Sequence, residues 1–162
     1  GKSVMGHGIH LNAGEVTALK EADAVVAHCP VANSFLGAGA MNRSRLRDAG
    51  VRIALGSDVG AGYELSMVRV ARSMIETATA IGAGFPTAAE AWHLITAGNS
   101  DALGWPEVGR LQVGASADLL VIQPDTDWLT NHPDPLGMLM FGWDDRCIRH
   151  TMVRGKFRFR RG

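Results

Sequence analysis

The stretch VRIALGSDVGAG, residues 51–62, is a run of strand-forming residues that ends at Ser57-Asp58 and continues into glycines. An apolar run bounded by turn residues is typical of a strand buried on both faces of a parallel sheet. Such a strand would deliver Asp58 as a fixed carboxylate at its end, and the glycines would let the loop clear a pocket. The alternative is that Asp58 caps a helix, but the next helical pattern begins several residues later.

Two further strands are predicted before this one, at residues 3–9 and 24–30. A helix follows the first strand, because Asn12 and Glu15 have the spacing of a capping box. Residues 31–40 are expected to form a glycine-containing loop. Apolar periodicity and capping residues predict further helices at residues 41–50, 65–81 and 87–104.

The chain changes character after Gly104, where short β patterns replace the alternation of strands and helices. The segment 109–124 predicts two short strands around a polar turn, and 148–161 predicts a hairpin with Phe157 and Phe159 facing inward. One helical turn is expected near residues 136–141.

This order of elements implies a parallel α/β unit followed by an antiparallel appendage. Three strand–helix units cannot close a barrel. The pattern therefore allows either a small open sheet or the last part of a (β/α)8 barrel.

Composition excludes several classes of partner. The 162 residues carry 16 basic and 16 acidic side chains, so no charge excess favours nucleic acid or an anionic membrane. No apolar run is long enough to cross a bilayer. Cys29 and Cys147 show no metal-type spacing and no disulfide framework, which favours a cytoplasmic protein. The chain begins Gly-Lys-Ser-Val without Met, so we expect it to be a piece of a longer protein.

Each predicted strand carries a polar residue near its carboxyl end: His7, His28 and Asp58. In parallel α/β folds these ends converge on one face, where functional groups collect. Two imidazoles and a carboxylate there suit a metal site or acid–base chemistry. Taken singly, each histidine also fits a buried structural role, with its ring hydrogen-bonded to a loop carbonyl.

Several segments resemble a known family. GHGIHL (6–11), AHCPVANSFLGAGAMN (27–42) and residues 51–62 resemble, in that order, the last three strands of an amidohydrolase-superfamily barrel. GRLQVGASADLLVIQP (109–124) is similar to the segment that follows the barrel and returns to a small β-sandwich. With MFGWDDRCIRHTMVRGK (140–156), the chain looks most like the guanine deaminases within that superfamily.

The resemblance implies an α/β fold in two parts. Residues 1–106 would be the last three βα units of a (β/α)8 metal-dependent hydrolase barrel, and 107–162 part of a C-terminal β-sandwich with a loop-rich insertion. It also implies zinc-dependent hydrolytic deamination of guanine to xanthine and ammonia, and a homodimer in the complete protein.

The same resemblance assigns roles to four residues. Asp58 matches the aspartate that binds the catalytic Zn²⁺ and moves protons, and His7 matches the histidine beside the metal-bound water and the purine. His28 lies near the site without being a ligand, and Asn33 holds the loop after its strand. A zinc-bound water is acidic enough to supply hydroxide near neutral pH.

The chain departs from the family in lacking the upstream His-x-His and the histidine of the fifth strand. We therefore expect these 162 residues to be inactive alone, to bind zinc weakly and to associate through uncovered strands. Two alternatives stay open. One is a related amidohydrolase acting on another aminopurine, an adenosine derivative or a triazine, and the other is a non-catalytic α/β binding module.

Overall fold

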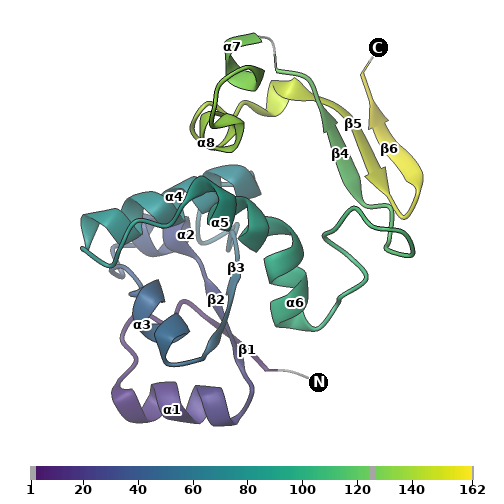
Figure 1. Ribbon diagram of the computed structural model, residues 1–162. Coiled ribbons are helices and arrows are strands. Elements are labelled where there is room, and N and C mark those ends of the chain that lie inside the picture. The colour runs from purple at the N-terminus through teal and green to yellow at the C-terminus, as the bar shows by residue number, and fades with distance from the viewer. Residues whose placement is uncertain (1–2, 125–126, 162) are drawn as a thin grey trace.

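A parallel sheet lies at the centre of the first part of the chain. The computed structural model describes residues 3–124 and 127–161. Strands β1 (Val4–Gly6), β2 (Val25–His28) and β3 (Arg52–Leu55) pair in parallel in the order β1-β2-β3. Val26 in the central strand is fully buried and lies level with Met5 and Ile53 on either side. The register sets the carboxyl ends of the three strands at one edge (Figure 1).

Helices α1 (Ala13–Glu21) and α3 (Arg43–Asp48) lead into β2 and β3 respectively (Figure 1). The predicted capping box of α1 is present. Asn12 Oδ1 accepts from the Glu15 amide at 3.0 Å, and Glu15 Oε2 accepts from the Asn12 amide at 2.7 Å. The cap satisfies amide groups that the helix itself leaves unpaired, which fixes where α1 begins.

The expectation of a loop throughout residues 31–40 was wrong. Helix α2 (Pro30–Phe35) begins directly after β2. Pro30 occupies its first turn, where a missing N–H costs nothing and the fixed φ of proline suits a helix. The predicted strand thus ends near Pro30, and the same residue starts a helix.

Helix α4 (Met67–Ala80) supplies the main apolar helical face, with Val70, Met74 and Ile75 almost completely buried. The predicted helix at 87–104 is present but not uniform. It comprises α5 (Ala88–His93), a π-helical segment (Leu94–Gly98) and α6 (Asn99–Leu103), with Thr96 in a non-helical conformation.

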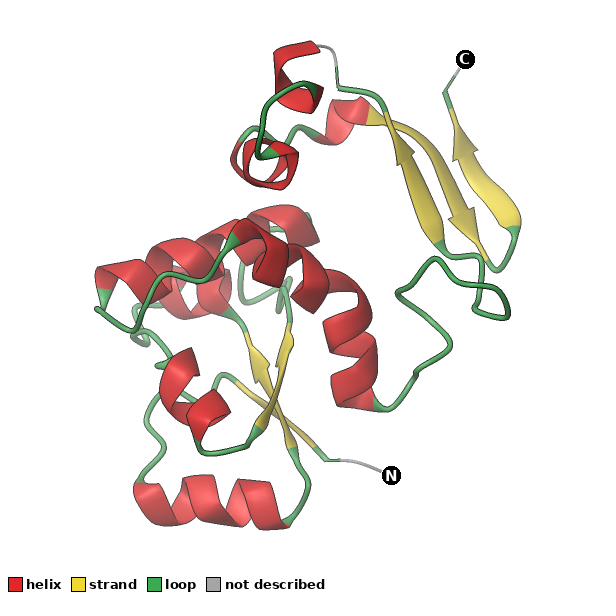
Figure 2. Cartoon of the chain, viewed as in Figure 1, coloured by secondary structure: helices red, strands yellow, loops and turns green. Residues whose placement is uncertain are grey.

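The rest of the chain forms a separate antiparallel sheet of order β4-β5-β6 (Figure 2). Arg154 and Gly155 make the turn between β5 and β6, as predicted. The elements of this part are β4 (Leu119–Ile122), α7 (Asp127–Thr130), α8 (Pro135–Phe141), the 3-10 turn η2 (Asp145–Cys147), β5 (Ile148–Val153) and β6 (Lys156–Arg160).

Two expectations for this sheet were wrong. No strand forms at residues 110–113, where Leu111 and Val113 are almost completely exposed and lack a strand to pair with among the described residues. Phe157 and Phe159 are not inward, because their exposed fractions are 42% and 44%. A shift in register between β5 and β6 interrupts the alternation on which the prediction relied.

Helix α8 attaches the antiparallel part to the α/β part. Arg72 on α4 donates to the carbonyl of Met140 at 3.2 Å, and the indole N–H of Trp92 on α5 donates to the carbonyl of Leu136 at 3.0 Å. The Trp92 and Trp143 rings meet edge to face, with centroids 5.8 Å apart. The contacts bury the α8 side of α4 and α5 (Figure 1).

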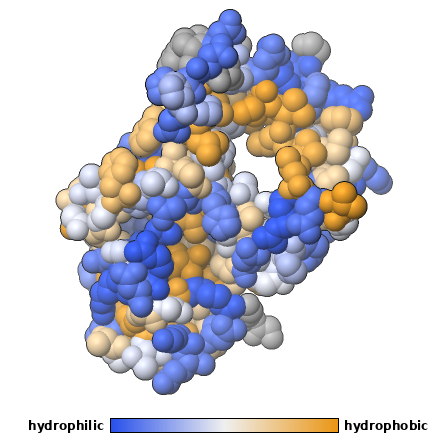
Figure 3. All heavy atoms as spheres, viewed as in Figure 1, coloured by the Kyte–Doolittle hydropathy of each residue, from blue (hydrophilic) through white to orange (hydrophobic). Residues whose placement is uncertain are grey.

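A hollow of about 760 Å³ separates the β4-β5-β6 sheet from α5 and α6. Apolar residues gather along its walls (Figure 3). The side chains that line it include Ile95, Leu103, Leu119, Ile122 and Trp143. No described strand covers this face of the sheet, so its apolar surface is left open. In the described part of the chain, no helix has the length and hydropathy needed to span a bilayer.

Asn99 at the start of α6 closes the open edge of the parallel sheet. Its side-chain oxygen accepts from the Leu55 amide at 2.7 Å, and its side-chain nitrogen donates to the Leu55 carbonyl at 2.9 Å. Leu55 is the last residue of β3 and is buried. One side chain therefore replaces the two backbone hydrogen bonds that a neighbouring strand would make.

We expect Asn99→Ala to lower the free energy of unfolding by about 1–3 kcal/mol, because it leaves the buried N–H and C=O groups of Leu55 without hydrogen-bond partners. Urea denaturation followed by circular dichroism measures the change. Asn131→Ala, at an exposed position, is the matched control and should stay within about 0.5 kcal/mol of the wild type. Equal stability of the two variants would contradict the role of Asn99.

His28, the last residue of β2, is 1% exposed. Burial, and then the nearby Arg43 cation, lower the pKa of His28 from 6.5 to about 4. Its Nδ1 atom has no hydrogen-bond partner among the described residues. His28 is therefore a neutral core side chain at neutral pH.

This burial predicts a pH-dependent stability. Between pH 6.5 and about 4, His28 is protonated in the unfolded chain but stays neutral in the folded chain. The free energy of unfolding should thus fall by about 3 kcal/mol as the pH decreases through that window. Urea melts across the window, with a chelator present, measure the loss. His28→Gln should show a markedly smaller loss, and an unchanged slope would contradict this prediction.

Candidate metal and hydrolytic site

The sheet edge brings two of the predicted site residues together. His7 directly follows β1, and Asp58 comes three residues after the end of β3. Although 51 positions separate them in the chain, His7 Nε2 lies 3.7 Å from Asp58 Oδ2. Both side chains are partly open, with exposed fractions of 45% and 33% respectively. The pair is therefore reachable from solvent.

Both residues adopt a left-handed backbone conformation, with φ of 70° at His7 and 50° at Asp58. Such angles are uncommon outside glycine, although Asp and His tolerate them better than most residues. Each costs on the order of 1–3 kcal/mol and persists only where the surrounding structure enforces it. The fold thus holds both side chains in place at a cost to stability.

The loop after Asp58 is tightly folded. The Asp58 carbonyl accepts hydrogen bonds from the amides of Ala61 and Gly62 at 3.2 and 2.8 Å. A Cβ at Gly62 would lie 3.1 Å from the Cα atom of Ala32 in α2. The glycine is needed for this close approach, and α2 thereby supports the turn that carries the carboxylate.

Asn33 of α2 fixes the orientation of His7. Its Oδ1 lies 2.7 Å from His7 Nδ1, and Asn33 is almost completely buried. Because an amide oxygen only accepts, this contact places the ring proton of a neutral His7 on Nδ1. The lone pair of His7 Nε2 then points toward the carboxylate of Asp58.

The Asp58 carboxylate is incompletely satisfied. Its Oδ2 is buried and has no hydrogen-bond partner among the described residues. When His7 is neutral with its proton on Nδ1, the Nε2 lone pair lies 3.7 Å from this oxygen, so two electron-rich atoms oppose each other. A cation or a donated proton between them removes this repulsion. The donor set, a carboxylate oxygen and an imidazole nitrogen, is one that zinc accepts.

Cys29 is the site residue that the sequence analysis missed. One donor atom each from His7, Cys29 and Asp58 lie within 4.8 Å of one another. Sequence spacing did not reveal this group, because each member comes from a different strand end and at least one helix separates consecutive members. The available signal was position: Cys29 directly follows β2, just as His7 directly follows β1.

The Cys29 thiol is buried, with an exposed fraction of 5%. Burial, and next the Asp58 carboxylate, raise the pKa of Cys29 above its usual value. The thiol donates from Sγ to the Ala27 carbonyl at 3.4 Å, and a weaker contact with the His7 backbone opposes the rise in its pKa. The thiol is therefore protonated and weakly bonded when no cation is bound.

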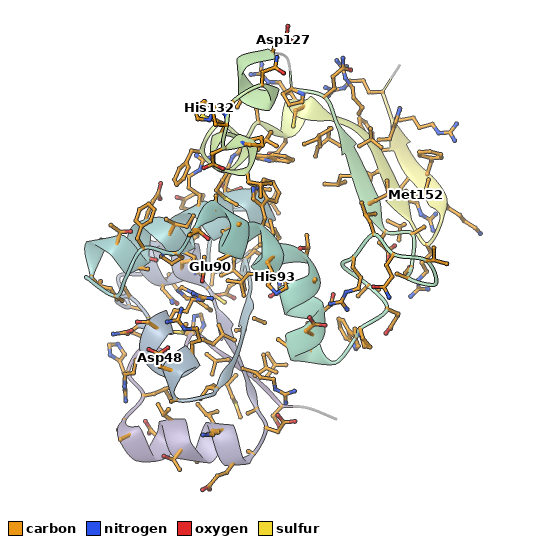
Figure 4. The ribbon with its side chains drawn as sticks, viewed as in Figure 1. Asp48, Glu90, His93, Asp127, His132 and Met152 are labelled. Atoms are coloured by element: carbon orange, nitrogen blue, oxygen red, sulfur yellow. The ribbon has the colours of Figure 1, made fainter. Side chains whose placement is uncertain are left out.

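His28 is not a member of this group, despite its position at the end of β2. The charged group that acts on His28 is Arg43 on α3, whose positive charge helps to lower the pKa of His28. His93 on α5 and His132 before α8 lie on other elements (Figure 4). Among the described residues, neither belongs to a group that would hold a metal.

The sequence has clear relatives. The amidohydrolase family profile matches residues 1–158. The chain is 35% identical over 156 residues to a 5-methylthioadenosine/S-adenosylhomocysteine deaminase of Halobacterium salinarum, covering 94% of this chain and 36% of that protein. It is 36% identical over 172 residues to the guanine deaminase of Homo sapiens, covering 96% and 38% respectively.

Solved structures of deaminases also resemble this chain. The guanine deaminase of E. coli superimposes with a TM-score of 0.90 at 29% identity, covering 98% of this chain and 39% of that one. A zinc-bound adenosine deaminase of Xanthomonas campestris gives 0.85 at 25%, covering 97% and 37%. The chain thus spans less than two fifths of the length of these relatives. From the strand-end residues and these matches together, the chain belongs to the amidohydrolase family.

Proposed function

We propose that this chain is the C-terminal, metal-binding part of a zinc-dependent hydrolase that deaminates guanine to xanthine and ammonia. The observation that carries the proposal is the Asp58 carboxylate, whose buried Oδ2 has no described protein partner and faces His7 Nε2 at 3.7 Å. The family match supports it, since the relatives named above are deaminases.

In this proposal Asp58 is both metal ligand and proton carrier. Zinc bound there would lower the pKa of a coordinated water to near neutrality. An Asp58 oxygen would accept a proton from the attacking water and later return a proton to the leaving amine. His7 Nε2 accepts a hydrogen bond from the water or, once protonated, stabilises negative charge that develops on the purine.

Two further residues support these groups in the proposal. Asn33 acts through His7, since its 2.7 Å contact keeps the Nδ1 atom of His7 occupied and the Nε2 atom available. His28 contributes packing behind the site, because it is neutral and buried at the end of β2. Neither residue would touch the substrate.

The proposal divides the chain as the sequence analysis did. Residues 1–106 would form the last three βα units of a (β/α)8 barrel, and 107–162 part of a β-sandwich. The hollow beside β4 and β5 supports this division, since its apolar lining calls for cover from residues outside the described chain. We also propose that the complete enzyme is a cytoplasmic homodimer.

We propose guanine rather than another substrate because the Asp144-Asp145-Arg146 segment resembles the corresponding segment of guanine deaminases. Arg69 on α4 lies 3.3 Å from Asp145 Oδ2 and 3.7 Å from Glu64 Oε1. Glu64 belongs to the loop that continues from Asp58. The segment is thus linked through Arg69 to the site.

A second candidate substrate is an adenosine derivative. Four 5-methylthioadenosine/S-adenosylhomocysteine deaminases match the chain at 33–36% identity, in the same range as the guanine deaminases.

The substrate assignment is tested on the protein encoded by the complete reading frame that contains this chain. We expect ammonia release with guanine to exceed that with 5-methylthioadenosine, S-adenosylhomocysteine, adenosine and an aminotriazine. The purified 162-residue chain should release none, because it supplies only part of the site. Faster turnover of 5-methylthioadenosine would favour the second candidate, and no turnover of any substrate would favour a binding module.

The role of Asp58 is tested in the same complete protein. Asp58→Asn keeps the shape but removes the charge and the proton acceptor, so kcat/KM should fall by about 10²–10⁴-fold. Asp48→Asn, on the exposed end of α3, is the matched control and should be unaffected. Chelation should abolish activity and added zinc should restore it. Full activity of Asp58→Asn would contradict the mechanism.

A further inference from the structure

We propose that the hollow between α3 and the turn that joins α4 to α5 binds a small oxyanion of the phosphate class, with Arg43 as its main donor. The hollow has a volume of about 450 Å³. It uses none of the residues of the strand-end site, and its occupation does not require deamination. The polar side chains that line it are Asn42, Arg43, Ser44, Arg47 and Glu90.

Arg43, the first residue of α3, is a buried cation. It is only 9% exposed, and its Nε atom has no hydrogen-bond partner among the described residues. Burial lowers the pKa of Arg43, and the Glu90 carboxylate partly opposes this through its charge and not through a hydrogen bond. Arginine stays protonated in proteins, so the side chain carries its charge into the hollow. A buried charge without a partner is costly, and an anion bound beside it would remove that cost.

Arg47 adds a second cation from the next turn of the same helix. Positions four apart lie on one face of a helix, so Arg43 and Arg47 are neighbours and repel each other. Arg47 Nε donates to Asp48 Oδ1 at 3.0 Å, but this ion pair is exposed and contributes little to stability. An anion between the two guanidinium groups would remove their repulsion.

Glu90 stands on the opposite wall and is held by its own helix. It reaches from α5 toward α3 (Figure 4). Its Oε2 accepts from the Thr87 amide at 2.9 Å and from the Thr87 hydroxyl at 3.2 Å, as part of the capping box of α5. The carboxylate is therefore already engaged. Two cations and one carboxylate line the hollow, so its lining carries a net positive charge.

The donor set favours an oxyanion. A guanidinium presents paired N–H groups that match two oxygens of one phosphate. Asn42 Oδ1 already accepts from the Ser44 hydroxyl at 2.9 Å and from the Arg45 amide at 3.0 Å, which leaves the side-chain N–H groups of Asn42 as donors. A phosphate has enough oxygens to contact both guanidinium groups and this amide at once, whereas a carboxylate has only two.

The test measures phosphate binding by isothermal titration calorimetry on the protein encoded by the complete reading frame, with folding checked by circular dichroism. A chelator is present, so that phosphate cannot bind to zinc. At constant ionic strength we expect one inorganic phosphate per chain and much weaker binding of acetate. Ribose 5-phosphate is the second ligand. Its binding would show that the site accepts phosphate esters, and its exclusion would show a site for the free ion; both results support an oxyanion site.

Matched variants locate the donor. Arg43→Met keeps the apolar stem but removes the charge, and should weaken phosphate binding at least about tenfold, because a hydrogen bond to a charged group is worth that much. Arg158→Met removes an exposed cation of β6 and should leave the affinity unchanged. Glu90→Gln keeps a residue suited to the capping box but removes the like charge, so it should tighten binding by about two- to tenfold. Arg43→Lys, which should keep only part of the affinity, serves if the methionine variant does not fold.

Three outcomes would overturn the proposed site: no phosphate binding by the folded wild-type protein, unchanged affinity in both Arg43 variants, or an equal loss in Arg158→Met. Weaker binding by folded Glu90→Gln would also contradict it. Because the titration is performed without metal, its failure leaves the proposed deamination to be judged separately by ammonia release.

Discussion

The register of three short parallel strands is the constraint on which the rest of the structure depends. Val25 lies level with Val4 on one side and Arg52 on the other, and the pairing continues to the carboxyl ends. Because these ends are level, residues that follow different strands become neighbours. This arrangement places His7 Nε2 3.7 Å from Asp58 Oδ2, although the two residues are far apart in sequence. No local motif would produce that contact.

Around this sheet edge, polar groups are held in positions that destabilise the folded state. Two left-handed residues, a buried carboxylate oxygen without a described partner and a buried neutral histidine all cost free energy. The surrounding packing offsets that cost. Asn33 orients His7, and Gly62 lets the Asp58 turn lie against α2. Strain concentrated at one edge of an otherwise ordinary core is what a binding or catalytic site requires.

Much of the first part of the chain could be predicted from sequence because the signals there are local. Apolar runs marked the three strands, and the capping box of Asn12 and Glu15 marked the start of a helix. Pro30 suits the end of a strand and also a first helical turn, so this residue alone does not distinguish a loop from helix α2. The inward assignment of Phe157 failed because a register shift is a property of two paired strands, which one strand's pattern does not contain.

The site was only partly predictable, because contacts between strands are not contained in the pattern of any one strand. His7 and Asp58 were found from their places at strand ends, whereas Cys29 was set aside because cysteine spacing was examined along the chain and not across the sheet. Conversely, His28 had the right position at a strand end but the wrong direction, since side chains alternate between the faces of a strand. Position along a strand and direction from it must both be known.

The most direct test of the central claim is zinc-edge anomalous diffraction from crystals of this chain grown with zinc. The account predicts an anomalous peak about 2.0–2.2 Å from an Asp58 carboxylate oxygen, beside His7 Nε2. A zinc ion bound elsewhere, with the Asp58 carboxylate turned away from His7 and hydrogen-bonded to protein donors, would contradict it.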